Sequence, residues 1–184
     1  MVTIASLWLA ILLSSALVWL ASAVVWMLLP HHKSEYKQVA NEEAARSALR
    51  GLAPGQYNIP HVTSPDELKK PEGLAKFNDG PVGFLTILPS RVPAMGKNMA
   101  TTFVFYAVVG LIVAYLSTRT LDATAEYLAV FRLTGTIAWL SYGMAVVPDA
   151  VWFGRPWASV LKTNADALLY AVLTAGVFAW LWPN

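Results

Sequence analysis

The sequence predicts an all-α membrane protein with four transmembrane helices and a small α+β polar domain inserted between the first and second helices. Hydrophobic residues make up 57% of the 184 positions and charged residues only 13%, against a usual share of roughly 25% charged residues. Of the 24 charged residues (13 basic and 11 acidic), 16 lie between Lys33 and Lys97. The remaining sequence contains long apolar stretches that lipid accommodates better than water does.

Residues 1–30 form the first predicted transmembrane helix. About 20 apolar residues are needed to cross roughly 30 Å of hydrocarbon, and no charged residue occurs before Lys33. The ASA sequence at residues 21–23 is typical of a signal-peptidase site. Because no basic residue precedes the apolar stretch, which continues to Leu29, we interpret the segment as an uncleaved anchor.

Residues 31–98 form the predicted polar domain, and its first element is a helix that continues to Arg50. Asn41 is suited to cap this helix, and Gly51 is suited to end it. Ser64 starts a second predicted helix, since it is followed by a proline and three residues later by a glutamate, as in a capping box.

A β-hairpin is predicted in the same domain. Residues 82–88 are rich in β-forming side chains and are followed by Pro89, a pattern that indicates a strand. Residues 56–62 are its expected partner, and Pro60 would place that strand at an edge. A domain of this size buries a thin core, so we expect it to rest on the membrane or on another protein.

The other three transmembrane helices are predicted in the C-terminal half. The second and fourth, residues 99–117 and 164–184, are almost free of charge, whereas the third, residues 123–147, contains Glu126 and Arg132. Residues 148–163 are expected to form an interfacial aromatic segment between the third and fourth helices.

Basic residues near the spans predict the orientation, because cytoplasmic loops are enriched in lysine and arginine. Residues 31–98 and the 148–163 segment together hold eleven basic residues outside the spans, whereas the opposite side holds only Arg119. We therefore expect a bacterial-type inner (plasma) membrane protein with both termini outside and residues 31–98 in the cytoplasm.

Arg132 is a candidate contact residue because a charge inside a span is costly and is usually paired or directed toward the interface. One interpretation is a structural arginine that reaches the headgroup layer. The other is a site for an anionic lipid headgroup or for a partner subunit. Glu126 is a possible partner within the chain, although a separation of six residues does not put the two on the same helix face. Asp122 is another possible partner.

Small residues recur every four positions in the last predicted helix. They form a strip along one helix face, and small residues allow close helix approach in lipid. The strip either packs the helices of this chain together or docks another subunit. Its members are Ala167, Ala171, Ala175 and Ala179.

An aromatic segment follows the third predicted helix. Tryptophan and arginine at a membrane exit are typical of the headgroup layer, so an interfacial anchor is the simplest interpretation, and a lipid or quinone cleft is the alternative. The candidate contact residues are Trp152, Phe153, Arg155 and Trp157.

The sequence predicts neither a cofactor nor a metal site. The absence of cysteine excludes disulfides, thiolate metal sites and c-type haem attachment. All three histidines lie outside the predicted spans, which argues against an intramembrane bis-histidine haem. His31, His32 and Glu35 were considered as metal ligands, but we expect adjacent histidines to point in different directions.

The function expected from these features is that of a non-catalytic accessory subunit of a larger inner-membrane complex, of respiratory or photosynthetic type for example. Its partners would be other integral membrane subunits and lipids, and the small net charge of +2 does not favour nucleic acid. One alternative is a small homo-oligomeric transporter or channel. Another is an interfacial lipid- or quinone-active enzyme using Asp149, Arg155 and Asp166.

Overall fold

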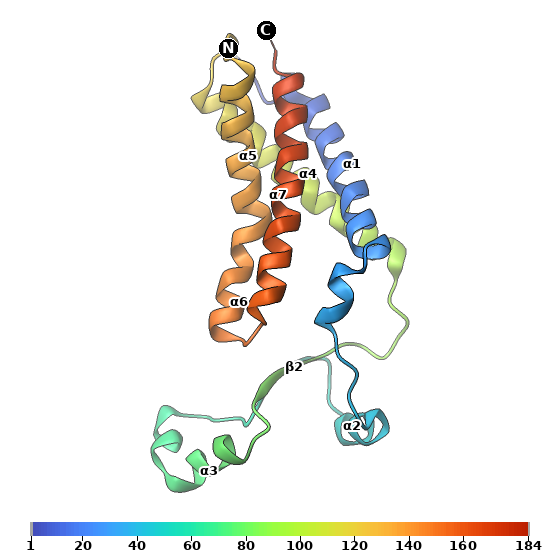
Figure 1. Cartoon of the computed structure of the whole chain (residues 1–184), viewed down its shortest axis with the longest axis vertical. Helices are drawn as coiled ribbons and strands as arrows, with labels where there is room; N and C mark the ends of the chain where they lie inside the picture. The colour runs from blue at the N-terminus through green and yellow to red at the C-terminus, as the bar shows by residue number, and fades with distance from the viewer. Residues whose placement is uncertain (1, 184) are drawn as a thin grey trace. The chain divides into compact units, whose positions relative to one another are not determined.

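Figure 1 shows the computed structural model of the chain, which describes residues 2–183. The chain divides into two compact units. A helical unit comprises Met1–Tyr36, Ala94–Pro148 and Pro156–Asn184, and a polar unit comprises Lys37–Pro93 and Asp149–Arg155. The larger unit is thus interrupted after its first helix by a polar segment, as the charge distribution predicts.

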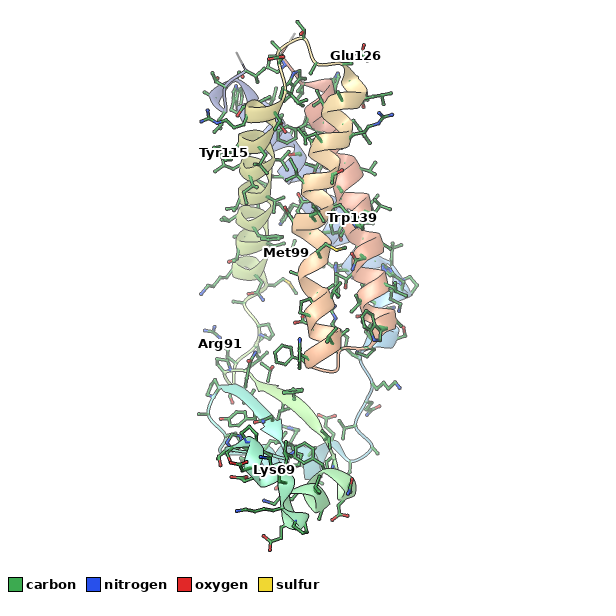
Figure 2. All side chains as sticks on the ribbon, turned by 90° about the vertical axis from the view of Figure 1, so that its left-hand side faces the viewer. Lys69, Arg91, Met99, Tyr115, Glu126 and Trp139 are labelled. Atoms are coloured by element: carbon green, nitrogen blue, oxygen red, sulfur yellow. The ribbon has the colours of Figure 1, made fainter. Side chains whose placement is uncertain are left out.

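Three helical segments among the described residues are long and apolar enough to cross a membrane: Ala5–Leu28, Met95–Thr120 and Tyr127–Trp152. Only 28%, 28% and 22% of their most apolar stretches are buried inside the chain. The rest presents carbon-rich side chains on the outside of the helices (Figure 2). Lipid provides the apolar surroundings that these side chains require, so the chain has the character of a multi-pass membrane protein.

The first of these segments changes its winding toward its end. It begins with the short 3₁₀ turn η1 (Ala5–Leu7), continues as α1 (Trp8–Ala23) and ends in the π-helical turn η2 (Val24–Leu28). Pro30 then starts the 3₁₀ helix η3 (Pro30–Glu35), because proline lacks the N–H that would continue the preceding helix.

The second and third segments are helical over most of their length. The second is the single helix α4 (Met95–Thr120). The third consists of α5 (Tyr127–Gly143), the 3₁₀ turn η5 (Met144–Val146) and α6 (Val147–Trp152). The third therefore begins four residues after its predicted start at residue 123, since residues 121–126 form the connection to α4.

The last helix, α7 (Trp157–Trp180), is 24 residues long but is not apolar enough to be counted with these three segments. Its first half carries Lys162, Asn164 and Asp166, which lower its hydropathy. It starts at residue 157 and not at 164, and only residues 153–156 of the segment 148–163 lie outside helices.

Small residues bring α5 and α7 together, and this is the most extensive helix pair of the unit. A Cβ atom added at Gly135 would lie 3.1 Å from the Cβ of Ala175, and one added at Gly143 would lie 2.9 Å from the Cβ of Ala167. Close backbone approach of this kind favours helix association in lipid. The glycines on α5 were not singled out from the sequence.

The start of α1 and the end of α7 lie at the same end of the helical unit (Figure 1). Val2 and Trp182 belong to one buried cluster, and the indole N–H of Trp182 donates to the carbonyl oxygen of Asp122 at 3.0 Å. Glu126 is at this end as well (Figure 2). The α4–α5 connection therefore meets both ends of the described chain.

The polar unit contains the predicted hairpin strands. β1 (Gly55–Ile59) pairs with β2 (Gly83–Ile87) in antiparallel register, with Tyr57 opposite Leu85. Pro60 follows directly after β1, where it removes no hydrogen bond from the ladder.

The helices of the polar unit match the prediction only at the first one. In α2 (Glu42–Leu49) the side chain of Asn41 accepts a hydrogen bond from the N–H of Ala44 at 3.0 Å, as expected of an N-cap. The capping box predicted at Ser64 is wrong: its side chain caps nothing in the 3₁₀ helix η4 (Pro65–Lys69), and the hydroxyl of Thr63 donates to Glu67 instead.

A further helix of the polar unit, α3 (Pro71–Asp79), was not predicted. In the structure Pro71 is the first residue of α3, a position where its missing N–H costs no hydrogen bond.

Candidate functional site

The densest cluster of ionisable side chains in the helical unit joins η3 to the first half of α7. Its members are His31, His32, Glu35 and Asp166. His32 and Asp166 are buried, and the side chain of Glu35 is only 8% exposed. Buried charged groups are costly unless they are paired, so this arrangement requires an explanation beyond a solvated surface.

Asp166 lies between the two histidines. Its Oδ1 atom is 3.1 Å from Nε2 of His31, and its Oδ2 atom is 2.7 Å from Nε2 of His32. The other ring nitrogen of His32, Nδ1, contacts Oε1 of Glu35. One imidazole therefore bridges two carboxylates, and one carboxylate bridges two imidazoles.

The backbone places the two histidines so that both reach the same carboxylate. They are adjacent in η3, a tight helix with three residues per turn, and their ring centroids are 4.0 Å apart with a 42° tilt. The two oxygens of Asp166 then accept from different sides. The expectation that adjacent histidines diverge from a common ligand is therefore wrong, because Asp166 projects between them.

Lys162 completes the electrostatics of the cluster. Its ammonium group donates to the backbone carbonyl of His31 and, at 2.8 Å, to the hydroxyl of Ser34. Burial opposes the ionisation of Glu35, but the hydrogen bonds from His32 and Ser159 and the charges of His32 and Lys162 outweigh it and lower its pKa.

Aromatic rings close the cluster toward the apolar part of the unit. Trp26, in η2, stacks on the imidazole of His32 with ring centroids 3.8 Å apart and an interplanar angle of 3°. One helical turn after Asp166, Tyr170 begins a group of edge-to-face tyrosines with Tyr106 and Tyr142. Trp26 thus covers His32 from the middle of the π-helical turn η2, and π-helical turns are frequent at functional sites.

The cluster combines residues that the sequence analysis placed in separate parts of the chain. His31 and His32 were assigned to the polar domain, yet both belong to the helical unit, whose first segment continues to Tyr36. From the sequence, Asp166 was placed with Asp149 and Arg155, as a candidate of the enzyme alternative. No local pattern relates Asp166 to His31, because 135 positions separate them.

Arg132 is the second feature of interest in the helical unit. It is exposed on α5 and makes no ion pair with any residue that the structure describes. Neither Glu126 nor Asp122 binds it. It borders a groove of about 220 Å³ between α5 and α7, whose floor includes Gly135, Ala171 and Ala175.

The alanine strip of α7 lies inside the bundle. Ala167, Ala171, Ala175 and Ala179 have exposed fractions of 1%, 2%, 0% and 7%. The strip therefore packs against other helices of this chain, which is the first of the two interpretations that the sequence left open.

The aromatic segment after α5 is exposed and includes a sharp turn. Trp152, Phe153 and Trp157 have exposed fractions of 74%, 58% and 57%, and Gly154 adopts a left-handed conformation with a φ of 69°. This turn lies between α6 and α7 in the chain.

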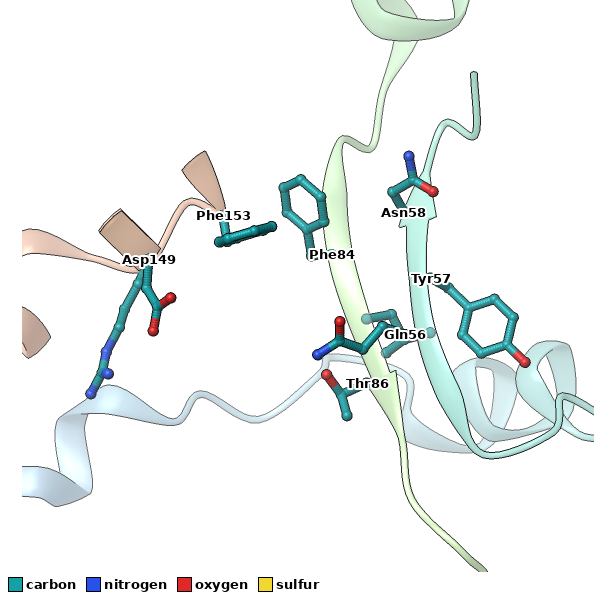
Figure 3. Close-up of a pocket in the computed structure, with 9 residues that line it drawn as sticks. Gln56, Tyr57, Asn58, Phe84, Thr86, Asp149 and Phe153 are labelled. Atoms are coloured by element: carbon teal, nitrogen blue, oxygen red, sulfur yellow. The ribbon is translucent and has the colours of Figure 1, made fainter. Parts of the chain in front are cut away.

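A pocket of about 460 Å³ lies in the polar unit against the sheet (Figure 3). Phe153 meets Phe84 of β2 edge to face, with ring centroids 5.3 Å apart, and Asp149 and Arg155 line the same pocket. Asp166 is instead held by the two histidines of the helical unit. The three residues of the enzyme hypothesis are thus distributed over two sites.

Comparisons of the chain with models of known protein families, with curated proteins and with solved structures found no match.

Proposed function

We propose that this chain is an accessory subunit of a larger inner-membrane complex, in which its exposed helix faces contact other integral membrane subunits and lipids. The observation that carries the proposal is Arg132, an exposed arginine that makes no ion pair with a described residue and lies on a helix apolar enough to span the membrane.

Four crossings are part of this proposal. α7 extends from the His31–His32 cluster at one end of the helical unit to the α4–α5 connection at the other, where Trp182 bonds to Asp122. It thus runs the length of the unit beside α5. With α7 as a fourth span, both termini are outside, and the basic residues favour a cytoplasmic polar unit.

The position of Arg132 supports a partner contact. It follows the start of α5 at Tyr127 by five residues, which at 1.5 Å per residue is roughly 7.5 Å along the helix. A charge on the outside of a span is costly in hydrocarbon and is usually paired. A carboxylate on a neighbouring subunit would provide that pairing, and the groove beside Arg132 gives space for one of its side chains.

The apolar exterior supports the same proposal. Most of each spanning segment is left uncovered by this chain, and among the uncovered residues are large side chains such as Leu128 and Leu140, also on α5. Lipid and apolar faces of other subunits both satisfy such surfaces. Arg132 is therefore the residue that distinguishes a partner face from a lipid face.

The experiment is native mass spectrometry of the chain after extraction from its own membrane in mild detergent. We expect a discrete assembly in which other integral membrane proteins are present in fixed stoichiometry. The Arg132→Leu variant should release the chain from this assembly, because the charge pairing is lost.

Arg119→Leu is the matched control, since Arg119 is also exposed near the same end of the bundle and lies over the ring of Tyr115 at 5.6 Å. It should leave the assembly intact. A homodimer that moves solute across liposomes would overturn the proposal, and so would an assembly unaffected by Arg132→Leu. Loss of only bound anionic lipid from that variant would reassign Arg132 to a headgroup.

A further inference from the structure

We propose that His31, His32 and Asp166 form a binding site for a divalent transition-metal ion of the zinc class, located where η3 meets α7. The proposal is independent of whether the chain belongs to a larger complex.

The donor atoms are of the right kind and are close together. Two imidazole nitrogens and a carboxylate oxygen are ligands that zinc uses, and one donor atom from each residue lies within 4.8 Å of the others. Zinc binds such donors at about 2.0–2.2 Å, so two ligands of a tetrahedral ion lie roughly 3.3–3.5 Å apart.

Both histidines lie slightly closer to Asp166 than two ligands of one zinc ion lie to each other. Nε2 of His31 is already 3.1 Å from Asp166, and Nε2 of His32 is 2.7 Å from it. A shift of the Asp166 side chain away from the two rings would lengthen both distances toward the spacing of two zinc ligands. His31 and His32 present the same ring nitrogen, Nε2, toward that carboxylate.

Glu35 supplies the supporting contact that metal-binding histidines usually have. A ligating histidine typically donates its other ring N–H to a carboxylate, which fixes the tautomer and the ring orientation. Nδ1 of His32 contacts Oε1 of Glu35 in this way, and Trp26 stacks on the same ring. His32 is thus held from two sides with Nε2 directed at Asp166.

The charge of the cluster also favours a cation. With both imidazoles neutral, as metal ligands are, Asp166 and Glu35 bring two buried carboxylates, with side chains 10% and 8% exposed, whereas Lys162 brings one ammonium group. Buried charges without compensation are costly, and a divalent ion between the carboxylate of Asp166 and the imidazoles provides that compensation.

Three protein ligands leave one coordination position of a tetrahedral ion for water or another small ligand, as in catalytic zinc sites. The ion would also link the residues that follow the first span to α7. The proposed site therefore has two consequences, an open coordination position and a brace between the first and last helices.

The test is direct metal binding by the full chain, purified in detergent with a tag that contains no histidine. After treatment with EDTA, the protein is titrated with Co²⁺, followed by ligand-field absorption, and with Zn²⁺, followed by elemental analysis after gel filtration. We expect one ion per chain and cobalt bands typical of four or five ligands.

Single substitutions test which residues bind the ion. Asp166→Asn and His32→Ala should weaken binding at least tenfold, and Glu35→Gln should weaken it by about 10–100-fold through loss of the supporting carboxylate. His61→Ala is the matched control and should bind as the unchanged protein does, because His61 lies in the polar unit and contacts Asn58. If Asp166→Asn does not fold, His31→Ala replaces it, since the His31 side chain is 34% exposed.

The proposal is overturned if the unchanged protein retains less than one ion per chain. It is also overturned if folded Asp166→Asn, His31→Ala and His32→Ala bind as the unchanged protein does, or if His61→Ala loses as much affinity as they do.

Discussion

Replacing Gly143 by alanine adds a single methyl group at the point where α5 packs closely on α7, and so tests that contact. The added Cβ would lie 2.7 Å from Oδ1 of Asn164 and 2.9 Å from the Cβ of Ala167. Carbon atoms normally approach to about 3.5–4.0 Å. Asn164 can rotate away, but the Cβ of Ala167 moves only with the backbone, so the two helices must separate locally.

The expected cost follows from this overlap. Inserting a methyl group into a tightly packed interior destabilises a protein by about 1–3 kcal/mol. Gly176→Ala is the matched control on α7, because its added Cβ meets no atom within 4 Å. That variant should gain up to about 1 kcal/mol from helix propensity, so the two variants should differ by roughly 1–4 kcal/mol.

Thermal unfolding in detergent, followed by the fluorescence of the eight tryptophans, measures this difference. One kcal/mol corresponds to roughly 2–4 °C in a chain of this size, so the Tm of Gly143→Ala should be about 2–12 °C lower than that of the unchanged protein. A Gly143→Ala protein at least as stable as Gly176→Ala would refute the close α5–α7 contact.

Three other predictions concern single contacts. Trp182→Phe keeps an aromatic ring but removes the hydrogen bond to the carbonyl of Asp122. The free energy of unfolding should therefore fall by about 0.5–1.5 kcal/mol. An unchanged free energy would show that this bond does not stabilise the end of α7. Asn41→Ala removes the cap of α2 and should destabilise that helix by about 1 kcal/mol, seen as faster amide exchange over residues 42–49; equal exchange would contradict the cap. Addition of Zn²⁺ after chelation should raise the Tm of the unchanged protein, because an ion at 100 times its Kd stabilises the folded state by about 2.7 kcal/mol. The same rise in the His32→Ala variant would contradict the proposed ligands.

Local patterns predicted the elements whose cause is local. The Asn41 cap depends on a side chain and an N–H three residues apart, and the hairpin strands depend on the residue types of β1 and β2. The prediction failed at Ser64 because the neighbouring Thr63 has the same kind of hydroxyl and bonds to Glu67 instead. Two candidates one residue apart cannot be ranked by residue type alone.

The start of α7 and the histidine cluster could not be predicted for a different reason. Lys162 and Asp166 lower the hydropathy of α7 and suggest an interfacial segment, yet in the structure each has a partner across the helical unit: Lys162 bonds to Ser34, and Asp166 bonds to His31 and His32. These partners are more than 120 positions away in the sequence. Hydrogen bonds between residues so far apart leave no local pattern in the sequence, so they become apparent only in the folded chain.

The proposed topology has four membrane crossings, and single-cysteine labelling tests them most directly. The chain has no cysteine, so a thiol introduced at Thr3, Thr63, Thr124 or Pro183 is the only one that reacts with a membrane-impermeant maleimide. In intact cells we predict labelling of the cysteine at Thr3, Thr124 and Pro183, and protection of the one at Thr63 until the cells are lysed. Protection at Pro183 would contradict a fourth span, and labelling at Thr63 in intact cells would contradict a cytoplasmic polar unit.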